Sequence, residues 1–496
     1  MDRKNDEKNA LKLKYNTVTA CLTGHEHFMN AIIDSDYESI GRLVNIAIRN
    51  NKSVWDIVRR LELAIAGKYQ VQSYEEKHYE LQRLVLSLEG PRLAYTLAKA
   101  LNLPSISTTH KHSHTPIIRP CIVFPTVTEI LDNILSLHNS GAFKTGRGSS
   151  VVVRRRGWRF LADEMALEEC PRYDSSRDAT LGMAREDAES CDLGKVTLET
   201  LHAAADALDK GSLTLAKEAT VMAITGYDKE YYVAFPVLIS GMKKTEDEAG
   251  QARWIAAGIE AWTTSPCGEA LYGPLWMVAS DGDATRRRAL HRLLTSHTLH
   301  KKHALYPLLS GLHGLNLGCD SEARTLSIDY KHKFKNFASL LRLPPGLMVL
   351  GHHVHHVQLH VLLQDKLEYH GIVLLGRFIG FLVEPFMSPE MSLSDQLTSL
   401  SAANHFYHIL YACNRTSFCP GQWFYDVGSL IKNIFFTAGR HKVTDGWDGQ
   451  NFGIYRDMDS SHNVDILQLS HRAGSAAEVA QIYARHPEWD CGHKWL

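Results

Sequence analysis

Between about residues 157 and 342 the chain alternates short apolar runs with stretches of helical pattern, which constrains the fold more than any other feature. Two of the helical stretches are TRRRALHRLLTSH and YKHKFKNFASLLR, each directly after an apolar run. Strands that alternate with helices indicate a mixed α/β domain. The runs that we predict as strands are WRFLADE, EATVMAIT from Glu218, YYVAFPVLIS from Tyr231, LWMVAS before Asp281, and TLSI before Asp329.

Three of these runs deliver an aspartate where a strand should meet a loop, namely Asp163, Asp281 and Asp329. Carboxylates that converge at strand ends hold Mg²⁺ or Mn²⁺, which prefer oxygen ligands. Two such ions activate a water and stabilise the leaving oxygen of a phosphodiester. The plainer interpretation is turn chemistry, because Asp caps helices and starts turns, and Asp281-Gly282 fits that pattern. Position alone favours the plainer interpretation.

Helical patterns flank this region on both sides. Apolar residues recur at three- and four-residue spacing from about 18 to 102, where a short helix from Gly90 ends at Asn-Leu-Pro. A stretch rich in Ser, Thr, His and Pro, residues 103–125, is predicted as a linker. From about 345 to 440 the pattern is helical without clear strands. The predicted organisation is α/β plus α, with an N-terminal helical domain (1–102), a linker and short helix (103–150), a mixed-sheet core (151–335), a helical insertion (336–440) and a truncated last part of the core (441–496).

Composition fits a globular protein of several domains. A chain of 496 residues is too long for one compact core, and no run of about 18 uncharged apolar residues predicts a membrane span. Nine cysteines without a CxxC pair favour a reducing compartment. The net charge of −1 divides into +7 up to Arg156 (22 Lys and Arg against 15 Asp and Glu) and −8 beyond it (32 against 40). This division fits a front that meets phosphate and a later region that holds cations, but chance gives such an imbalance as well.

Four segments resemble segments of a known family, in order and in rough spacing. They are ADEMALEECPRYDSSRDATLG, with Asp163-Glu164-Met165, Tyr173-Asp174 and Leu181-Gly182; the upstream GPRLAYTLAKALNLPS; ASDGDATRRR; and DYKHKFKNFASLLR. Together they resemble P element-type transposases. From about residue 25 onward, most of the chain resembles transposon-derived proteins that are common in mushroom-forming fungi.

The resemblance implies an RNase H-like core, split by helices, that cleaves and joins DNA strands in the nucleus with three acidic residues and two Mg²⁺ or Mn²⁺ ions. Asp163 and Asp281 match the first two acids and are the expected catalytic and metal-binding residues. Asp329 and Lys335 match a pair that contacts a bound guanine nucleotide, where a lysine meets phosphate and an aspartate accepts from the base. DNA is the expected partner, and a homo-oligomer stays open.

The third acidic residue is missing from its expected place. Relatives carry D-x-L-E before a Phe and an Arg that match Phe452 and Arg456 here, so the Glu position falls on Gly449. The substitutes nearby are Asp448, Asp457 and Asp459. Three interpretations follow: a transposase-like enzyme, a metal-dependent nuclease without transposition partners, or a non-catalytic module that binds nucleic acid or protein.

Two further patterns have competing interpretations. The cluster GHHVHHVQLH from Gly351 holds histidines at the i, i+4 spacing that chelates zinc, but a polar helix face or a loop is favoured. The triplets Arg154–Arg156 and Arg286–Arg288 fit contacts with DNA phosphates or a solvated helix face equally well. No GxxxxGK[ST], HExxH or GxSxG occurs, which leaves ATPase, zincin and α/β-hydrolase chemistry without support.

Overall fold

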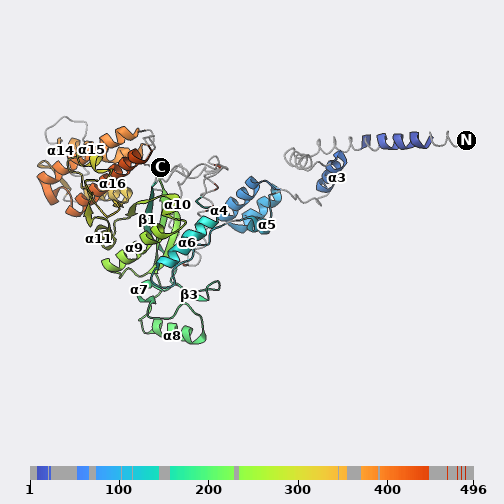
Figure 1. The fold of residues 1–496 in the computed structure, drawn as a ribbon, viewed down its shortest axis with the longest axis horizontal. Coiled ribbons are helices and arrows are strands. Elements are labelled where there is room, and N and C mark those ends of the chain that lie inside the picture. Colours follow the sequence, from blue (N-terminus) through green and yellow to red (C-terminus); the bar gives the residue numbers. More distant parts are fainter. Residues whose placement is uncertain are drawn as a thin grey trace. The chain divides into compact units, whose positions relative to one another are not determined.

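The chain divides into two compact units, Met1–Ser113 and His114–Leu496, which are described separately (Figure 1). The computed structural model describes residues 8–19, 22–23, 53–65, 74–101, 103–113, 115–143, 157–227, 234–343, 346–354, 370–388 and 391–445, with the single residues 466, 478, 482 and 486.

The first unit is helical. It contains α3 (Val54–Ile65), α4 (Glu76–Ala100) and α5 (Ile106–His112). The helix predicted from Gly90 is the second half of α4, which bends at Gly90 where φ is 82° and Pro91 follows. The predicted linker was wrong over α5, because Ser105 caps a short helix by accepting the N–H of Thr108.

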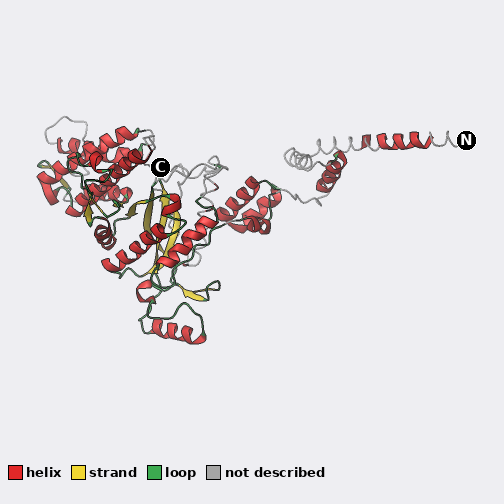
Figure 2. Ribbon diagram, viewed as in Figure 1, coloured by secondary structure: helices red, strands yellow, loops and turns green. Residues whose placement is uncertain are grey.

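The second unit is built on a five-stranded mixed sheet, drawn in yellow between helices in Figure 2. Its strand order is β5-β4-β1-β6-β9; β1, β4 and β5 pair antiparallel, whereas β1, β6 and β9 pair parallel. All five predicted runs form these strands, which confirms the mixed sheet. The bounds are β1 (Trp158–Ala166), β4 (Glu218–Gly226), β5 (Phe235–Met242), β6 (Leu275–Ser280) and β9 (Thr325–Ile328).

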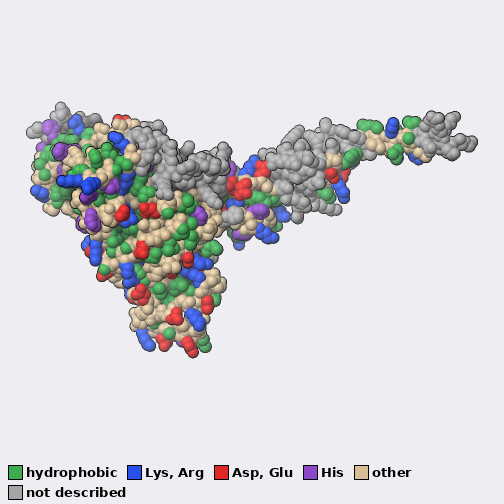
Figure 3. All heavy atoms as spheres, viewed as in Figure 1, with side chains coloured by type: hydrophobic (Ala, Val, Ile, Leu, Met, Phe, Trp, Pro, Cys, Tyr) green, Lys and Arg blue, Asp and Glu red, His purple; other side chains and the backbone are tan. Residues whose placement is uncertain are grey.

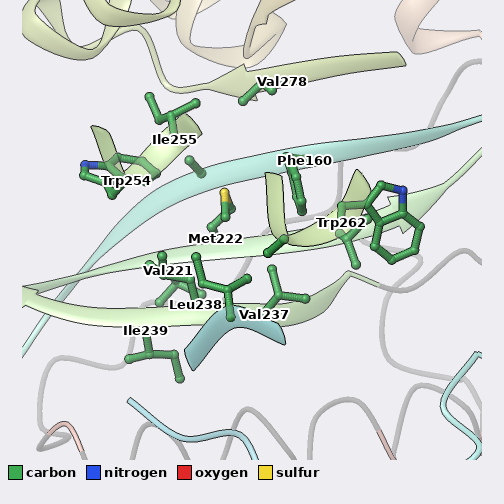
Figure 4. Packing of buried hydrophobic residues seen from close by; sticks show 14 of the residues in the cluster. Phe160, Val221, Met222, Val237, Leu238, Ile239, Trp254, Ile255, Trp262 and Val278 are labelled. Atoms are coloured by element: carbon green, nitrogen blue, oxygen red, sulfur yellow. The ribbon is translucent and has the colours of Figure 1, made fainter. Parts of the chain in front are cut away.

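Helices cover both faces of the sheet. On one face α9 (Glu248–Thr264) packs so closely on β4 that a Cβ at Gly258 would lie 2.1 Å from the end of Met222. Trp254, Phe160 and their neighbours fill this layer in Figure 4. α11 (Ala284–Leu294) packs beside α9, and α16 (Gly421–Asp445) covers β9 on the opposite face.

The segment between β9 and α16 is mostly helical. It comprises α13 (Tyr330–Arg342), α14 (His370–Met387) and α15 (Leu393–Asn414). It also contains a hairpin of β10 (Leu347–Val349) and β11 (His352–Val354), so the prediction of helices without strands was wrong here. The two-residue turn explains the difference, because Leu350 and Gly351 both have positive φ, as a tight hairpin requires.

α14 is long and apolar enough to cross a membrane by length and composition alone, among the residues that the structure describes. Its buried residues instead join the core of the helical segment, where Phe378 stacks on Tyr407 of α15 at 5.3 Å. The remaining elements are α6 (Val127–Asn139), β2 (Arg172–Asp174), β3 (Ala179–Leu181), α7 (Arg185–Ala188), α8 (Leu198–Asp209), α10 (Glu269–Tyr272), β7 (His297–Thr298), α12 (Tyr306–Leu309), β8 (Gly318–Cys319) and the 3₁₀ turn η4 (Arg415–Ser417).

Candidate functional site

Two of the predicted aspartates follow a pair of opposite residues on neighbouring parallel strands. Ala162 of β1 lies opposite Ser280 of β6, and Asp163 and Asp281 are the next residues along the chain. Asp281 directly follows the end of β6, whereas β1 continues for three residues beyond Asp163, so the prediction that Asp163 ends its strand was wrong. Neighbouring strands lie about 4.8 Å apart, and residues in the same register position face the same side of the sheet. We call Asp163 and Asp281 the acid pair.

The acid pair shares one electrostatic environment. Burial raises the pKa of the Asp163 carboxyl although its side chain keeps contact with solvent, and the negative charge of Asp281 raises it further; the Glu164 N–H and Arg286 act in the opposite direction. Asp163 accepts the N–H of Glu164 at 2.8 Å, and Asp281 accepts the N–H of Asp283 at 3.1 Å. Because the negative charge of Asp281 raises the pKa of Asp163, a cation beside the two carboxylates would be favoured.

A buried arginine stands beside this pair. The side chain of Arg286 in α11 is 0% exposed, and its Nη1 lies 3.6 Å from Oδ1 of Asp281. Its Nη2 lies 2.5 Å from Oε1 of Glu164, which precedes Met165 in β1 and faces the opposite side of the sheet from Asp163. One positive charge is therefore already fixed next to the acid pair.

Glu164 links this arginine to a second cation. Its Oε2 lies 3.0 Å from Nζ of Lys244, which also contacts Glu218 at 2.7 Å. Burial alone would raise the pKa of Glu164, but Arg286 and Lys244 outweigh burial and lower it. The carboxylates of Glu218 and Glu164 raise the pKa of Lys244 to about 12. Glu164 therefore stays ionised and bound to cations of the chain itself.

Asp329 reaches the same edge of the sheet, one strand further along. Its N–H donates to the Ser280 carbonyl oxygen, and its carboxylate caps α13 by accepting the N–H of Lys331. It also lies 3.6 Å from Nε2 of His332. Lys335 is exposed on α13, about 9 Å further along the helix axis at 1.5 Å per residue. The described contacts of Asp329 do not include Lys335, so the structure does not bring this pair together.

A carboxylate that the sequence did not single out approaches the site from α16. Asp426 is 1% exposed, and its Oδ2 lies 2.5 Å from Nζ of Lys333 in α13 and 2.7 Å from Nη1 of Arg287 in α11. Lys333 borders the turn after Asp281, because a Cβ at Gly282 would lie 3.2 Å from its Nζ. The only signal in the sequence was a lone acid inside the apolar stretch WFYDVGSLI.

The three arginines of α11 do not share one environment, so neither contacts with DNA phosphates nor a solvated helix face describes all of them. Arg286 is buried against Glu164 and Arg287 is 15% exposed against Asp426, so neither is a solvated residue or an open phosphate contact. Only Arg288, 59% exposed and 3.5 Å from Glu248, fits the solvated face. Arg154–Arg156 lie outside the described residues. On the described surface of the second unit in Figure 3, basic and acidic side chains are interspersed.

The remaining predicted ligands do not complete a site. Among the described residues, no group of three or more His, Cys, Asp or Glu could hold a metal ion. Asp448, Asp457, Asp459 and Gly449 lie outside the described residues, as does the histidine cluster beyond β11. Among the described residues, Asp163 and Asp281 therefore have no third His, Cys, Asp or Glu that completes a metal-binding group with them.

Comparisons with known proteins give one likeness. No family model matches the chain, and no curated protein matches it. A solved structure, the Drosophila P element transposase strand transfer complex, is similar with a TM-score of 0.48 and 12% identity, over 86% of this chain and 96% of that one. At this level of similarity, function has to be argued from the strand order and contacts of the chain itself.

Proposed function

We propose that this chain is a transposase-like protein that acts on DNA in the nucleus through an RNase H-like core, with the acid pair holding one Mg²⁺ or Mn²⁺ ion. The observation that carries the proposal is that Asp163 in β1 and Asp281 after β6 directly follow Ala162 and Ser280, which lie opposite each other on parallel strands. The sheet supports it as well. Strands β1, β4 and β5 pair antiparallel, and β6 and β9, parallel to β1, extend its other side, which is compatible with the proposed RNase H-like core.

The residues of the site have different proposed roles. Asp163 supplies negative charge from inside β1 and Asp281 from directly after β6, and the N–H groups of Glu164 and Asp283 fix one oxygen of each. A divalent ion bound there would polarise a phosphoryl oxygen and lower the pKa of a bound water. Asp329, directly after β9, is proposed to contact a guanine nucleotide together with Lys335, as the resemblance implies.

The test combines metal binding with strand cleavage. Mn²⁺ binding is measured by calorimetry, and nicking of supercoiled plasmid is measured with Mg²⁺ or Mn²⁺. We expect Asp163→Asn and Asp281→Asn to abolish both, whereas Asp209→Asn, at the exposed end of α8, leaves both unchanged. Wild-type protein that neither binds Mn²⁺ nor nicks DNA would contradict the enzymatic proposal.

One observation favours a second function, a non-catalytic module that binds DNA. The carboxylates around the acid pair are already bound to cations of the chain, Glu164 by Arg286 and Asp426 by Lys333 and Arg287. This function predicts a DNA mobility shift without nicking, unchanged in Asp163→Asn. The guanine nucleotide is tested separately with a fluorescent GTP analogue, whose binding Lys335→Ala should weaken.

A further inference from the structure

We infer that Arg286 is a resident counter-cation of the acid pair, which holds the site to weak binding of a single divalent ion. This inference rests on the proposed metal site and assigns an electrostatic role toward the acid pair to Arg286, which the sequence analysis considered only for contacts with DNA phosphates or as part of a solvated helix face. It predicts an unusual direction of change, since removing one arginine should strengthen metal binding.

The guanidinium is held in place from several sides. Nη2 donates to Glu164 at 2.5 Å, Nε donates to Oε1 of Gln251 at 3.3 Å, and the group lies 5.7 Å from the ring centre of Trp254. The remaining nitrogen, Nη1, is fully buried and has no hydrogen-bond acceptor among the described residues. Its nearest charged neighbour is Oδ1 of Asp281 at 3.6 Å. The unsatisfied N–H groups therefore lie on the side of the acid pair.

The backbone allows this arginine little freedom to withdraw. α11 begins three residues after Asp281, and Asp283 caps it by accepting the N–H groups of Thr285 and Arg286 at 2.9 Å each. Arg286 is thus fixed in the first turn of a helix whose start is tied to the strand that carries Asp281. Arg288, two residues on, is 59% exposed and contacts only Glu248 at 3.5 Å among the described ion pairs.

The positive charge of Arg286 would weaken the binding of a divalent ion. An ion between Asp163 and Asp281 would meet the buried positive charge of Arg286, whose Nη1 lies 3.6 Å from Oδ1 of Asp281, so the two cations would repel each other. A second ion would meet the same charge and would lack a third free carboxylate among the described residues, since Asp426 is bound to Lys333 and Arg287.

The experiment measures Mn²⁺ binding by the loss of the free-ion electron paramagnetic resonance signal, in the full chain. We expect Arg286→Gln to bind Mn²⁺ at least about tenfold more tightly than wild type, because it removes the nearby charge and keeps a polar side chain. Arg286→Lys keeps the charge and should stay within about threefold of wild type. The matched control is Arg288→Gln, which also removes one positive charge, at an exposed position, and should change nothing.

The outcomes separate the inference from the proposed function. Tighter binding by Arg286→Gln that Asp163→Asn abolishes supports the inference, even where wild type binds too weakly to measure. Wild-type binding that depends on Asp163 but is unchanged or weaker in Arg286→Gln overturns the inference and leaves the proposed function standing. Binding by neither protein overturns both.

A second variant pair keeps the test valid if Arg286→Gln does not melt cooperatively. Glu164→Gln with Arg286→Gln removes both members of the buried ion pair, so no uncompensated charge remains. This double variant should bind Mn²⁺ more tightly than Glu164→Gln alone, and equal affinities would contradict the inference.

Discussion

Two parts of α16 satisfy buried charges in different ways. In its first two turns, the Asp426 carboxylate contacts two cations, Arg287 of α11 and Lys333 of α13. From its middle onward, two buried cations contact main-chain carbonyl oxygens instead. Lys432 donates to Gly318 at 2.9 Å, and Arg440 donates to Trp276 at 3.1 Å and also to Ala323.

Burial shifts the pKa values of these two cations. It lowers the pKa of Lys432 to about 8 and that of Arg440 to about 10. Carbonyl dipoles satisfy donors without supplying a full negative charge, so these cations anchor α16 to the sheet and offer nothing to a ligand. The proposed metal site lies instead beside the partly solvated charges around the acid pair.

The largest effect is expected from Asp426→Ala. It leaves Lys333 and Arg287 buried without their carboxylate, and breaking a buried ion pair costs about 3–5 kcal/mol. Urea unfolding measures the loss. Replacing Lys333 by Met in the same protein should restore part of it, and a change below about 1 kcal/mol would show that the network is not a structural link.

A smaller effect of opposite sign is expected at Lys432, in the middle of α16. Lys432→Met removes a buried charge and should stabilise the fold by about 1–2 kcal/mol at pH 7, the gain from lost desolvation less one hydrogen bond. The folded-state pKa is lowered, so the wild type regains stability as pH rises from about 8 towards about 10.5. The advantage of the variant should shrink over that window, and an advantage that is constant with pH would contradict the assignment.

Asp163→Asn should stabilise the fold slightly, by less than about 1 kcal/mol, because the carboxyl is partly solvated. Its folded-state pKa is raised, so the ionised form costs stability at pH 7, and this cost disappears as the carboxyl takes up a proton on acidification. Thermal melts at pH 7 and pH 4 should therefore show a gain only at the higher pH. Added Mn²⁺ should stabilise the wild type and leave the variant unchanged.

The smallest effect is expected at the exposed pair on the α9 and α11 surfaces. Glu248→Gln breaks the contact of Glu248 with Arg288, where both side chains are largely solvated. Such pairs contribute about 0–0.5 kcal/mol, and the loss should vanish in 0.5 M salt. A loss comparable with that of Asp426→Ala would remove the distinction between buried and solvated charges drawn above.

Much of the sheet followed from the sequence, because strand periodicity is a local signal. The five apolar runs gave the five strands, and adjacent parallel strands brought Asp163 next to Asp281. The helix at Ser105 and the hairpin at Leu350 were missed because a single cap or turn decided them.

The buried ion pairs could not be predicted from local sequence patterns. Asp426 and Lys333 are 93 positions apart, and Arg286 and Glu164 are 122 apart, so neither contact has a local pattern. The three arginines of one triplet have three different environments, because successive residues of a helix point in directions about 100° apart. Which of them is buried depends on the neighbours that the fold supplies.

Because α16 packs on β9, the strand is synthesised well before the helix that covers it. Thr325 of β9 bonds to Asn433 of α16 at 2.7 Å, across 108 positions of the chain. At a synthesis rate of roughly 5–20 residues per second, about 5–20 s pass between the emergence of the strand and that of its helix. During that interval the nascent chain carries an apolar strand with one side uncovered, and we expect chaperones that hold unfolded chains to engage it there.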